Sequence, residues 1–250
     1  MNSKIFNIAH RGFSGKFPEN TLLSISQAVE EGAHIVETDL QLTKDNEIVL
    51  FHDATVDRIL HESQNKSIAD FFLKQIKEKD FGSWLNPEFK NCKIATLKEI
   101  LEFKSNSEKD FDYILEIKGS FPNKIIPKIK DLLDEFNFTF KIGYLSVKDE
   151  IAYKIALENG FKNEQIGIMQ KKRKPSEIID LAKQLKAKII QIRTNNWVDK
   201  DWKLLQKSDL LFTIFYADSK EKYQFYSKFS PYGIFTNYPD LLSIFLSLSN

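Results

Sequence analysis

Short apolar runs alternate with longer segments of helical periodicity along almost the whole chain, and this alternation constrains the fold more than any other feature. The runs are apolar throughout, which is typical of strands buried on both faces of a parallel sheet. We predict strands near residues 4–9, 34–39, 112–117, 140–145, 165–169, 188–192, 210–215 and 233–236. We predict helices near residues 21–31, 97–104, 123–136, 148–159, 175–186, 199–207, 219–228 and 240–248.

This alternation, within a chain of 250 residues, matches the element count and the size of a (β/α)8 barrel, the TIM barrel fold. A doubly wound open sheet is the alternative that alternation alone leaves open. Gly32 and Gly160 follow two of the predicted helices, where a residue with positive φ ends a helix, and Pro175 opens another. We therefore predict a single α/β domain over residues 1–250.

One segment interrupts the alternation after the second strand. Residues 48–51 form a further apolar run, and Asp45-Asn46 before it predicts a two-residue hairpin turn. In that register Asp39 would lie directly opposite His52. The excursion over residues 53–96 is too long for a plain loop, so we predict a small insertion packed against the barrel.

Composition excludes several classes of protein. The formal net charge is only +1, so no global field attracts nucleic acid. No stretch approaches the roughly 20 apolar residues of a membrane helix, and the first residues carry too short an apolar run for a signal peptide. The single cysteine, Cys92, cannot form an internal disulfide. We expect a cytoplasmic protein without a nucleic-acid partner or stable membrane insertion, and the sequence leaves the oligomeric state open.

Ionisable groups stand where four successive apolar runs stop. In a barrel, the carboxyl ends of the strands meet at one mouth. Taken singly, each group has an ordinary structural explanation, such as a surface ion pair or a packed histidine. Their recurrence at successive strand ends favours a shared site. The four runs end in His10-Arg11, Glu37-Thr38-Asp39, His52-Asp53 and Glu116-Ile117-Lys118.

These residue types suit phosphodiester chemistry. Three carboxylates cannot stay ionised side by side without a cation, and an all-oxygen set suits Mg²⁺ or Ca²⁺. Two imidazoles suit general acid and base catalysis near neutral pH. An arginine and a lysine suit recognition of a phosphate group. We therefore assign Glu37, Asp39 and Glu116 to a divalent cation, His10 and His52 to proton transfer, and Arg11 and Lys118 to phosphate.

Several short motifs, in order and spacing, make the chain resemble the glycerophosphodiester phosphodiesterase family. The resemblance covers nearly the whole chain and is most specific in the first 60 residues, whereas residues 140–210 match only as a generic barrel. It implies a (β/α)8 barrel with an insertion after the second strand, and the hydrolysis of a glycerophosphodiester to an alcohol and glycerol 3-phosphate. The motifs are His10-Arg11-Gly12, Pro18-Glu19-Asn20-Thr21, Glu37-Thr38-Asp39, His52-Asp53, Glu116-Ile117-Lys118 and Gly233-Ile234-Phe235-Thr236-Asn237.

By the same resemblance, His10 and His52 would be the acid–base pair, and Glu19 would support the site. The chain departs from the family pattern at residues 215–218, where a Trp-Thr-Val-Asn-like stretch is usual, and at Asn237, where aspartate is usual. Phe215 keeps an aromatic wall for the substrate. The departures bear on head-group preference rather than on the chemistry.

Two other functions remain open at this stage. A phospholipase of the D type or the phosphatidylinositol-specific C type also uses histidines at a barrel mouth, and a non-catalytic barrel would bind a phosphorylated ligand without turnover. The basic run Lys171-Lys172-Arg173-Lys174 has two interpretations, a solvated loop face or an anion-binding patch. We expect His34 and the three tryptophans to serve packing, with Trp84 the best placed of these to cover the mouth.

Overall fold

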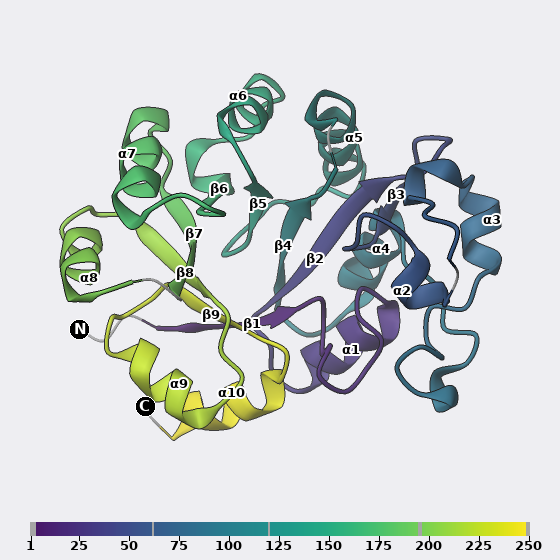
Figure 1. Cartoon of the computed structure of the whole chain (residues 1–250), viewed down its shortest axis with the longest axis horizontal. Coiled ribbons are helices and arrows are strands. Elements are labelled where there is room, and N and C mark those ends of the chain that lie inside the picture. Colours follow the sequence, from purple (N-terminus) through teal and green to yellow (C-terminus); the bar gives the residue numbers. More distant parts are fainter. Residues whose placement is uncertain (1–3, 62, 120, 195–196, 249–250) are drawn as a thin grey trace.

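The computed structural model describes residues 4–61, 63–119, 121–194 and 197–248, and its centre is a closed barrel of parallel strands (Figure 1). The sheet order runs β1-β9-β8-β7-β6-β5-β4-β2, and the pairing of β1 with β2 closes it. The predicted (β/α)8 barrel is therefore confirmed and the open sheet is excluded. The barrel strands are β1 (Phe6–His10), β2 (Ile35–Leu42), β4 (Asp112–Ile117), β5 (Tyr144–Val147), β6 (Ile166–Met169), β7 (Ile189–Arg193), β8 (Leu211–Phe215) and β9 (Gly233–Thr236).

Helices surround the strands as an outer layer (Figure 1). Their apolar faces and the outward faces of the strands form the largest hydrophobic cluster of the molecule. Among the described residues, no helix combines the length and the apolar character needed to cross a membrane. These helices are α1 (Leu22–Glu30), α4 (Leu97–Asn106), α5 (Pro122–Glu135), α6 (Glu150–Glu158), α7 (Pro175–Leu185), α8 (Asp199–Gln206), α9 (Lys220–Ser227) and α10 (Pro239–Ser247).

The fourth barrel strand, β5, begins later than predicted. The apolar run suggested a strand over 140–145, but β5 covers Tyr144–Val147. The reason is the Asp112 carboxylate, whose Oδ2 accepts hydrogen bonds from the backbone N–H groups of residues 141, 142 and 143 at 2.7–2.9 Å. The N–H groups of residues 141–143 are therefore bonded to this carboxylate and are not available for hydrogen bonds to a neighbouring strand.

Inside the barrel, one apolar layer lies below one polar layer. The apolar layer contains Ile8, Ile35, Ile114, Tyr144, Ile189 and Phe235. Successive residues of a strand point to opposite faces, so the residue two positions later also points inward. At these positions the chain carries His10, Glu37, Glu116, Ser146, Gln191 and Asn237. The strand period therefore places a ring of polar groups at the carboxyl end of the barrel.

The hairpin after β2 forms, but its predicted register is wrong by one residue. Strand β3 (Ile48–Leu50) runs antiparallel to β2, with Leu40 opposite Leu50. The Phe51 N–H therefore donates to the Asp39 carbonyl at 2.8 Å, and His52 lies one residue beyond. The turn spans residues 44–46 rather than two residues, because Asn46 adopts a φ of 61° and a Thr43–Glu47 hydrogen bond closes it.

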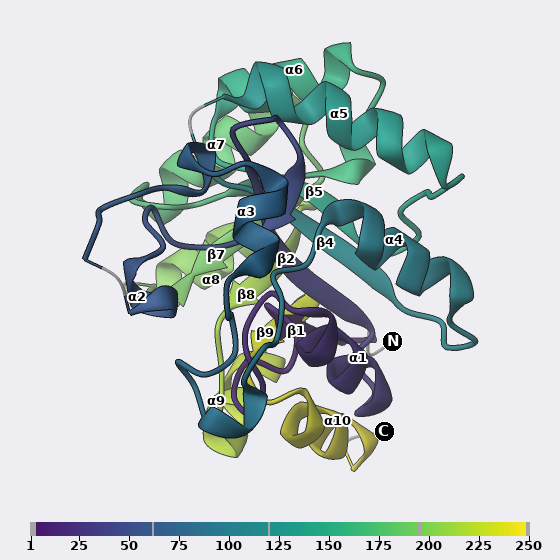
Figure 2. The ribbon, with the colours of Figure 1, turned by 90° about the vertical axis from the view of Figure 1, so that its right-hand side faces the viewer.

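The long excursion folds as a packed unit beside β2 and β3. It contains α2 (Asp57–Leu60), η1 (Ile68–Asp70), α3 (Leu73–Glu78) and η2 (Pro87–Phe89). Figure 1 shows α2 and α3 on the side of the barrel where β3 lies, and Figure 2 shows them outside the strands. A separate hydrophobic cluster holds the excursion together, and it includes Val49 and Phe51 of the hairpin. The β2–β3 hairpin therefore anchors the insertion to the barrel.

Candidate active site

A cavity of about 410 Å³ opens at the carboxyl ends of the barrel strands. A cavity of this size accepts a small organic phosphate. Most of its lining comes from strand ends that are far apart in sequence. The lining residues are His10, Arg11, His52, Glu116, Lys118, Met169, Gln191, Arg193, Phe215, Tyr216 and Asn237.

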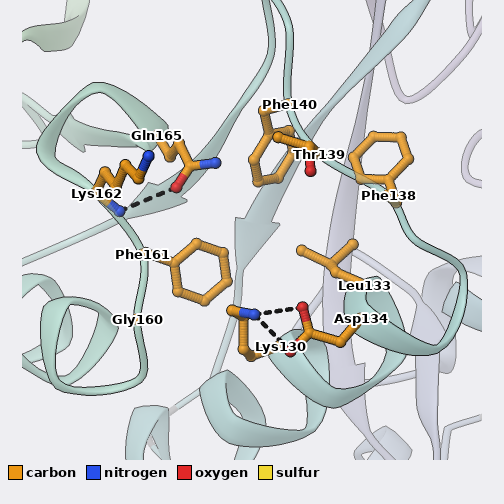
Figure 3. A pocket seen from close by; sticks show the side chains of 10 residues that line it. All are labelled: Lys130, Leu133, Asp134, Phe138, Thr139, Phe140, Gly160, Phe161, Lys162 and Gln165. Carbon is orange, nitrogen blue, oxygen red and sulfur yellow. Dashed lines mark hydrogen bonds and ion pairs between the residues drawn. The ribbon is translucent and has the colours of Figure 1, made fainter.

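Another pocket lies away from this mouth, between α5 and the segment that leads into β6 (Figure 3). Its residues 138–140 and 160–165 precede β5 and β6, so it belongs to the amino ends of the strands. Phe138 and Phe161 form apolar walls, and Lys130 is paired with Asp134. This pocket brings together no set of groups suited to catalysis.

Three buried carboxylates meet below the mouth cavity. Glu37, Asp39 and Glu116 each offer an oxygen, and the three oxygens lie within 4.8 Å of one another. Parallel pairing of β2 with β4 puts Asp39 beside Glu116, and the strand period puts Glu37 on the same face. The structure thus brings together the three residues that the sequence assigned to a cation.

Two cations partly compensate this acidic cluster. Lys118 pairs with Glu116 and lies 3.0 Å from Asp39, and the Arg11 Nε lies 3.2 Å from Asp39. Burial would raise the pKa of Asp39, but Lys118 and Arg11 hold it below its ordinary value. Asp39 is therefore ionised across the neutral range.

Glu37 has less compensation than Asp39, because its Oε2 accepts the Arg11 backbone N–H at 3.0 Å whereas the Lys118 and Arg11 side chains pair with Asp39. Burial, followed by the charges of Asp39 and Glu116, raises its pKa well above the ordinary value. Its Oε1 is buried and has no hydrogen-bond partner. Two cations against three acids leave one negative charge, so the cluster fits one divalent cation with oxygen ligands from Glu37, Asp39 and Glu116.

His10 is held in one tautomer by a chain of polar residues. Its Nδ1 lies 2.8 Å from the Asn237 Oδ1, and the Asn237 Nδ2 donates to the Asp218 Oδ2 at 2.7 Å. A carboxylate only accepts hydrogen bonds, so it fixes the Asn237 amide, and the amide oxygen must then accept from His10. The Nδ1 of His10 carries the proton, and Nε2, 4.0 Å from the Glu37 Oε2, keeps its lone pair.

The neutral form of His10 is strongly favoured. Burial, with a contribution from the neighbouring Arg11, lowers its pKa from 6.5 to about 3. A neutral imidazole with a free Nε2 accepts a proton, so His10 is equipped to act as a base.

Replacing the carboxylate at the end of this chain tests the tautomer assignment. In Asp218→Asn, the new side-chain N–H can donate to the Asn237 Oδ1, which favours a flipped Asn237 amide. The Asn237 Nδ2 would then face His10 and favour the tautomer without a proton on Nδ1. We expect turnover to fall about 10- to 100-fold with little change in stability, as for other supporting residues of a site. Steady-state kinetics and ¹⁵N-histidine NMR measure both effects, and Asp131→Asn, at an exposed position on α5, is the control. An unchanged tautomer would contradict the assignment.

His52 occupies a more open position at the same cavity. Its side chain is 34% exposed, and its Nδ1 lies 2.7 Å from the Asp53 Oδ1. Although burial opposes it, the hydrogen bond from Arg58 holds the pKa of Asp53 below its ordinary value, so this carboxylate accepts from His52. Arg58 also donates to Glu19, which accepts from Arg11 at 2.9 Å. The insertion thereby fixes both the histidine and the arginine of the mouth.

The structure places the remaining predicted residues at the site in different ways. Phe215 forms part of the cavity wall, with its ring 5.0 Å from the His10 ring. Glu19 does not line the cavity and instead anchors Arg11 and Arg58. The one-residue register error does not remove His52 from the site, because His52 lies beyond the end of β3 and faces the mouth.

Sequence reasoning gave no site role to Met169, Gln191, Arg193, Tyr216 and Asp218. Gln191 and Arg193 end β7 two positions apart, so the rule that selected Glu116 and Lys118 would have selected them. Tyr216 follows β8 and stacks on His10 at 6.0 Å. Asp218 lay in the stretch 215–218 that departs from the family pattern, but only the folded chain brings it to Asn237.

The packing expected of His34 and Trp202 is confirmed, whereas the expectation that Trp84 covers the mouth is not. His34 accepts a hydrogen bond from the Asn7 N–H, and Trp202 is buried and stacked on Phe229. Trp84 does not line the mouth cavity. It packs against the core of the insertion and lies under the Arg58 guanidinium, 4.8 Å from the ring centre.

The fold and the site define a (β/α)8-barrel protein whose mouth combines a cluster of three buried acids with two histidines. The family model described as the glycerophosphoryl diester phosphodiesterase family matches residues 10–240, and the chain belongs to this family.

Related proteins share parts of the sequence or the whole fold. The glycerophosphodiester phosphodiesterases of Caldanaerobacter subterraneus and Bacillus subtilis are 38% and 36% identical to it, over 56% and 46% of the chain. The chain spans about half the length of these relatives, 56% and 41% respectively. A solved Oleispira antarctica phosphodiesterase, in complex with the product sn-glycerol-3-phosphate, has a TM-score of 0.84 at 22% identity and 96% coverage of both chains. At that identity the likeness shows the fold.

Proposed function

We propose that the chain is a cation-dependent enzyme that hydrolyses glycerophosphodiesters to an alcohol and glycerol 3-phosphate. The observation that carries this proposal is the pairing of a buried neutral histidine and an open, carboxylate-bound histidine at one cavity, above the three acids. Membership of the family supports the same reaction. The product named for the Oleispira antarctica structure supports glycerol 3-phosphate as one product here.

The two histidines have complementary roles in this proposal. The Nε2 of His10 takes a proton from the attacking oxygen, which bonds to phosphorus as the bond to the alcohol oxygen breaks. Protonated His52 donates the Nε2 proton to that leaving oxygen, while Asp53 holds its Nδ1 proton. After the reaction His10 is protonated and His52 is neutral. Proton exchange with solvent then returns both histidines to their starting states.

The charged groups of the mouth hold the phosphate during this exchange. Arg11 and Lys118 line the cavity and offer donors to the phosphoryl oxygens. A divalent cation bound by Glu37, Asp39 and Glu116 supplies neutralisation of the charge on those oxygens. Phe215 and Tyr216 form an aromatic wall beside His10, against which the glycerol carbon chain packs.

Removal of the cation is expected to stop the reaction. Glycerol 3-phosphate release is measured with choline, ethanolamine, glycerol and inositol diesters, before and after exhaustive dialysis against EDTA. We expect loss of at least about 10²-fold in rate, because the charge stabilisation of the transition state is lost, with recovery on adding Mg²⁺ or Ca²⁺. Full activity after chelation would contradict the cation, and no release from any of the four diesters would contradict the proposed reaction.

A further inference from the structure

A basic pocket of about 330 Å³ adjoins the mouth cavity. The two hollows share Glu116, Lys118, Met169 and Arg193 as a common wall. The basic pocket extends beyond this wall to Lys148, Lys171 and Lys172. Five of its lining side chains are thus cationic, while Glu116 is its single acid and is already paired with Lys118.

Apart from Lys118, the cations of this pocket have no acidic partner among the described residues. Within residues 4–61, 63–119, 121–194 and 197–248, no ion pair joins Lys148, Lys171, Lys172 or Arg193 to a carboxylate. Lys148 donates instead to the Gly119 carbonyl at 2.7 Å. Partial burial and the nearby charge of Lys148 lower the pKa of Lys171. The like charges therefore repel one another, and an anion between them relieves that repulsion.

A buried side chain holds the loop that presents these lysines. Gln170 is buried, and its backbone N–H donates to the Gln191 carbonyl at 2.8 Å. Its Oε1 accepts from the Arg193 N–H and from the Trp197 Nε1, at 2.8 and 3.1 Å. Its Nε2 donates to the Arg173 carbonyl at 2.9 Å. The loop is thereby fixed to β7 before any ligand arrives.

The four residues of the basic run consequently do different things. The Arg173 guanidinium turns inward and donates to the carbonyls of Lys148 and Met169, both at 3.3 Å. Lys171 and Lys172 line the basic pocket, whereas Lys174 is exposed outside it. Lys171 and Lys172 are therefore solvent-exposed residues that also line the basic pocket beside the mouth, whereas Arg173 serves the loop itself.

We propose that the basic pocket is a second anion-binding subsite, which receives a phosphate or carboxylate carried by the alcohol part of the phosphodiester. The proposal rests on the proposed function, because the shared wall at Lys118 places the reacting phosphate next to the pocket. It predicts that an acidic head group binds better than a neutral or purely cationic one. The net charge of the chain is only +1, so this preference comes from the local charge of the pocket and not from the overall field of the molecule.

Two phosphate esters that differ by a single carboxylate test the subsite without turnover. Calorimetry measures the affinity of O-phosphoserine and O-phosphoethanolamine for the Mg²⁺-loaded chain. We expect O-phosphoserine to bind about fivefold more tightly, and added salt to reduce the difference. The double variant Lys171→Gln/Lys172→Gln is expected to remove the preference, and Lys174→Gln, from the same run, to keep it.

Equal affinities in the unaltered chain, or a preference that survives the double variant, would overturn the subsite. A second measurement separates this result from a failure of the proposed function. The ratio of kcat/KM for glycerophosphoserine to that for glycerophosphoethanolamine should fall about fivefold in the double variant, with the rate on the ethanolamine diester unchanged. Absence of turnover of both diesters would contradict the proposed hydrolysis and not the subsite, because the binding comparison does not depend on catalysis.

Discussion

His10→Ala is expected to lower kcat by about 10²- to 10⁴-fold while leaving the barrel folded, since it removes the group that accepts the proton in the transition state. His52→Ala is expected to cause a loss of similar size, because the leaving oxygen then departs without a proton. His10 lies among Phe215, Tyr216 and Phe235, so its loss also leaves a small cavity. His10→Asn is the second variant, which keeps more of the volume and still lacks the base.

The readouts are glycerol 3-phosphate release at saturating substrate and thermal unfolding of each variant. The control is His61→Asn, at an exposed position of the insertion where a φ of 51° suits asparagine. It should retain full activity. Activity within a few fold of the unaltered chain in either the His10 or the His52 variants would contradict the proton-transfer roles.

Glu37→Gln is expected to abolish tight cation binding and to make the cation-free protein more stable at high pH. The glutamine is isosteric but neutral, so a cation loses a charged ligand, and we expect its affinity to fall at least about 100-fold. Without the cation, Glu37 is a buried carboxylate whose pKa stays raised despite the nearby Lys118 and Arg11, and replacing it should stabilise the fold by about 1–3 kcal/mol above that pKa.

The pH dependence follows from the direction of the Glu37 pKa. A carboxyl group whose pKa is raised by folding stabilises the protein below its unfolded pKa. That stability is lost as the pH rises through the folded pKa. The cation-free protein should therefore become less stable as the pH increases from about 5 into the alkaline range, and Glu37→Gln should flatten this slope.

Chemical unfolding at several pH values, with and without Mg²⁺, measures these effects. Glu47→Gln is the control, because Glu47 is exposed in the hairpin turn. Its slope and its cation affinity should match those of the unaltered chain. A Glu37→Gln variant that binds Mg²⁺ as tightly as before would remove Glu37 from the cation site.

The sequence largely predicted which residues meet at the mouth of the barrel, because strand period and chain direction are local properties. Because Ile35 and Ile114 point into the barrel, Glu37 and Glu116, two positions later on the same strands, must point inward too. The same rule would have found Gln191 and Asn237. The hairpin register was not predictable, because it depends on whether Asn46 takes a positive φ and lengthens the turn by one residue.

By itself, the sequence determined the barrel, the polar ring at its mouth and the identity of the groups that meet there. The tertiary structure alone decided the state of those groups. Asp218 sets the tautomer of His10 through Asn237, and Glu37 is less compensated than Asp39 because the Lys118 and Arg11 side chains pair with Asp39. The physical reason is that a tautomer or a pKa depends on partners within a few ångströms, and those partners come from distant parts of the chain.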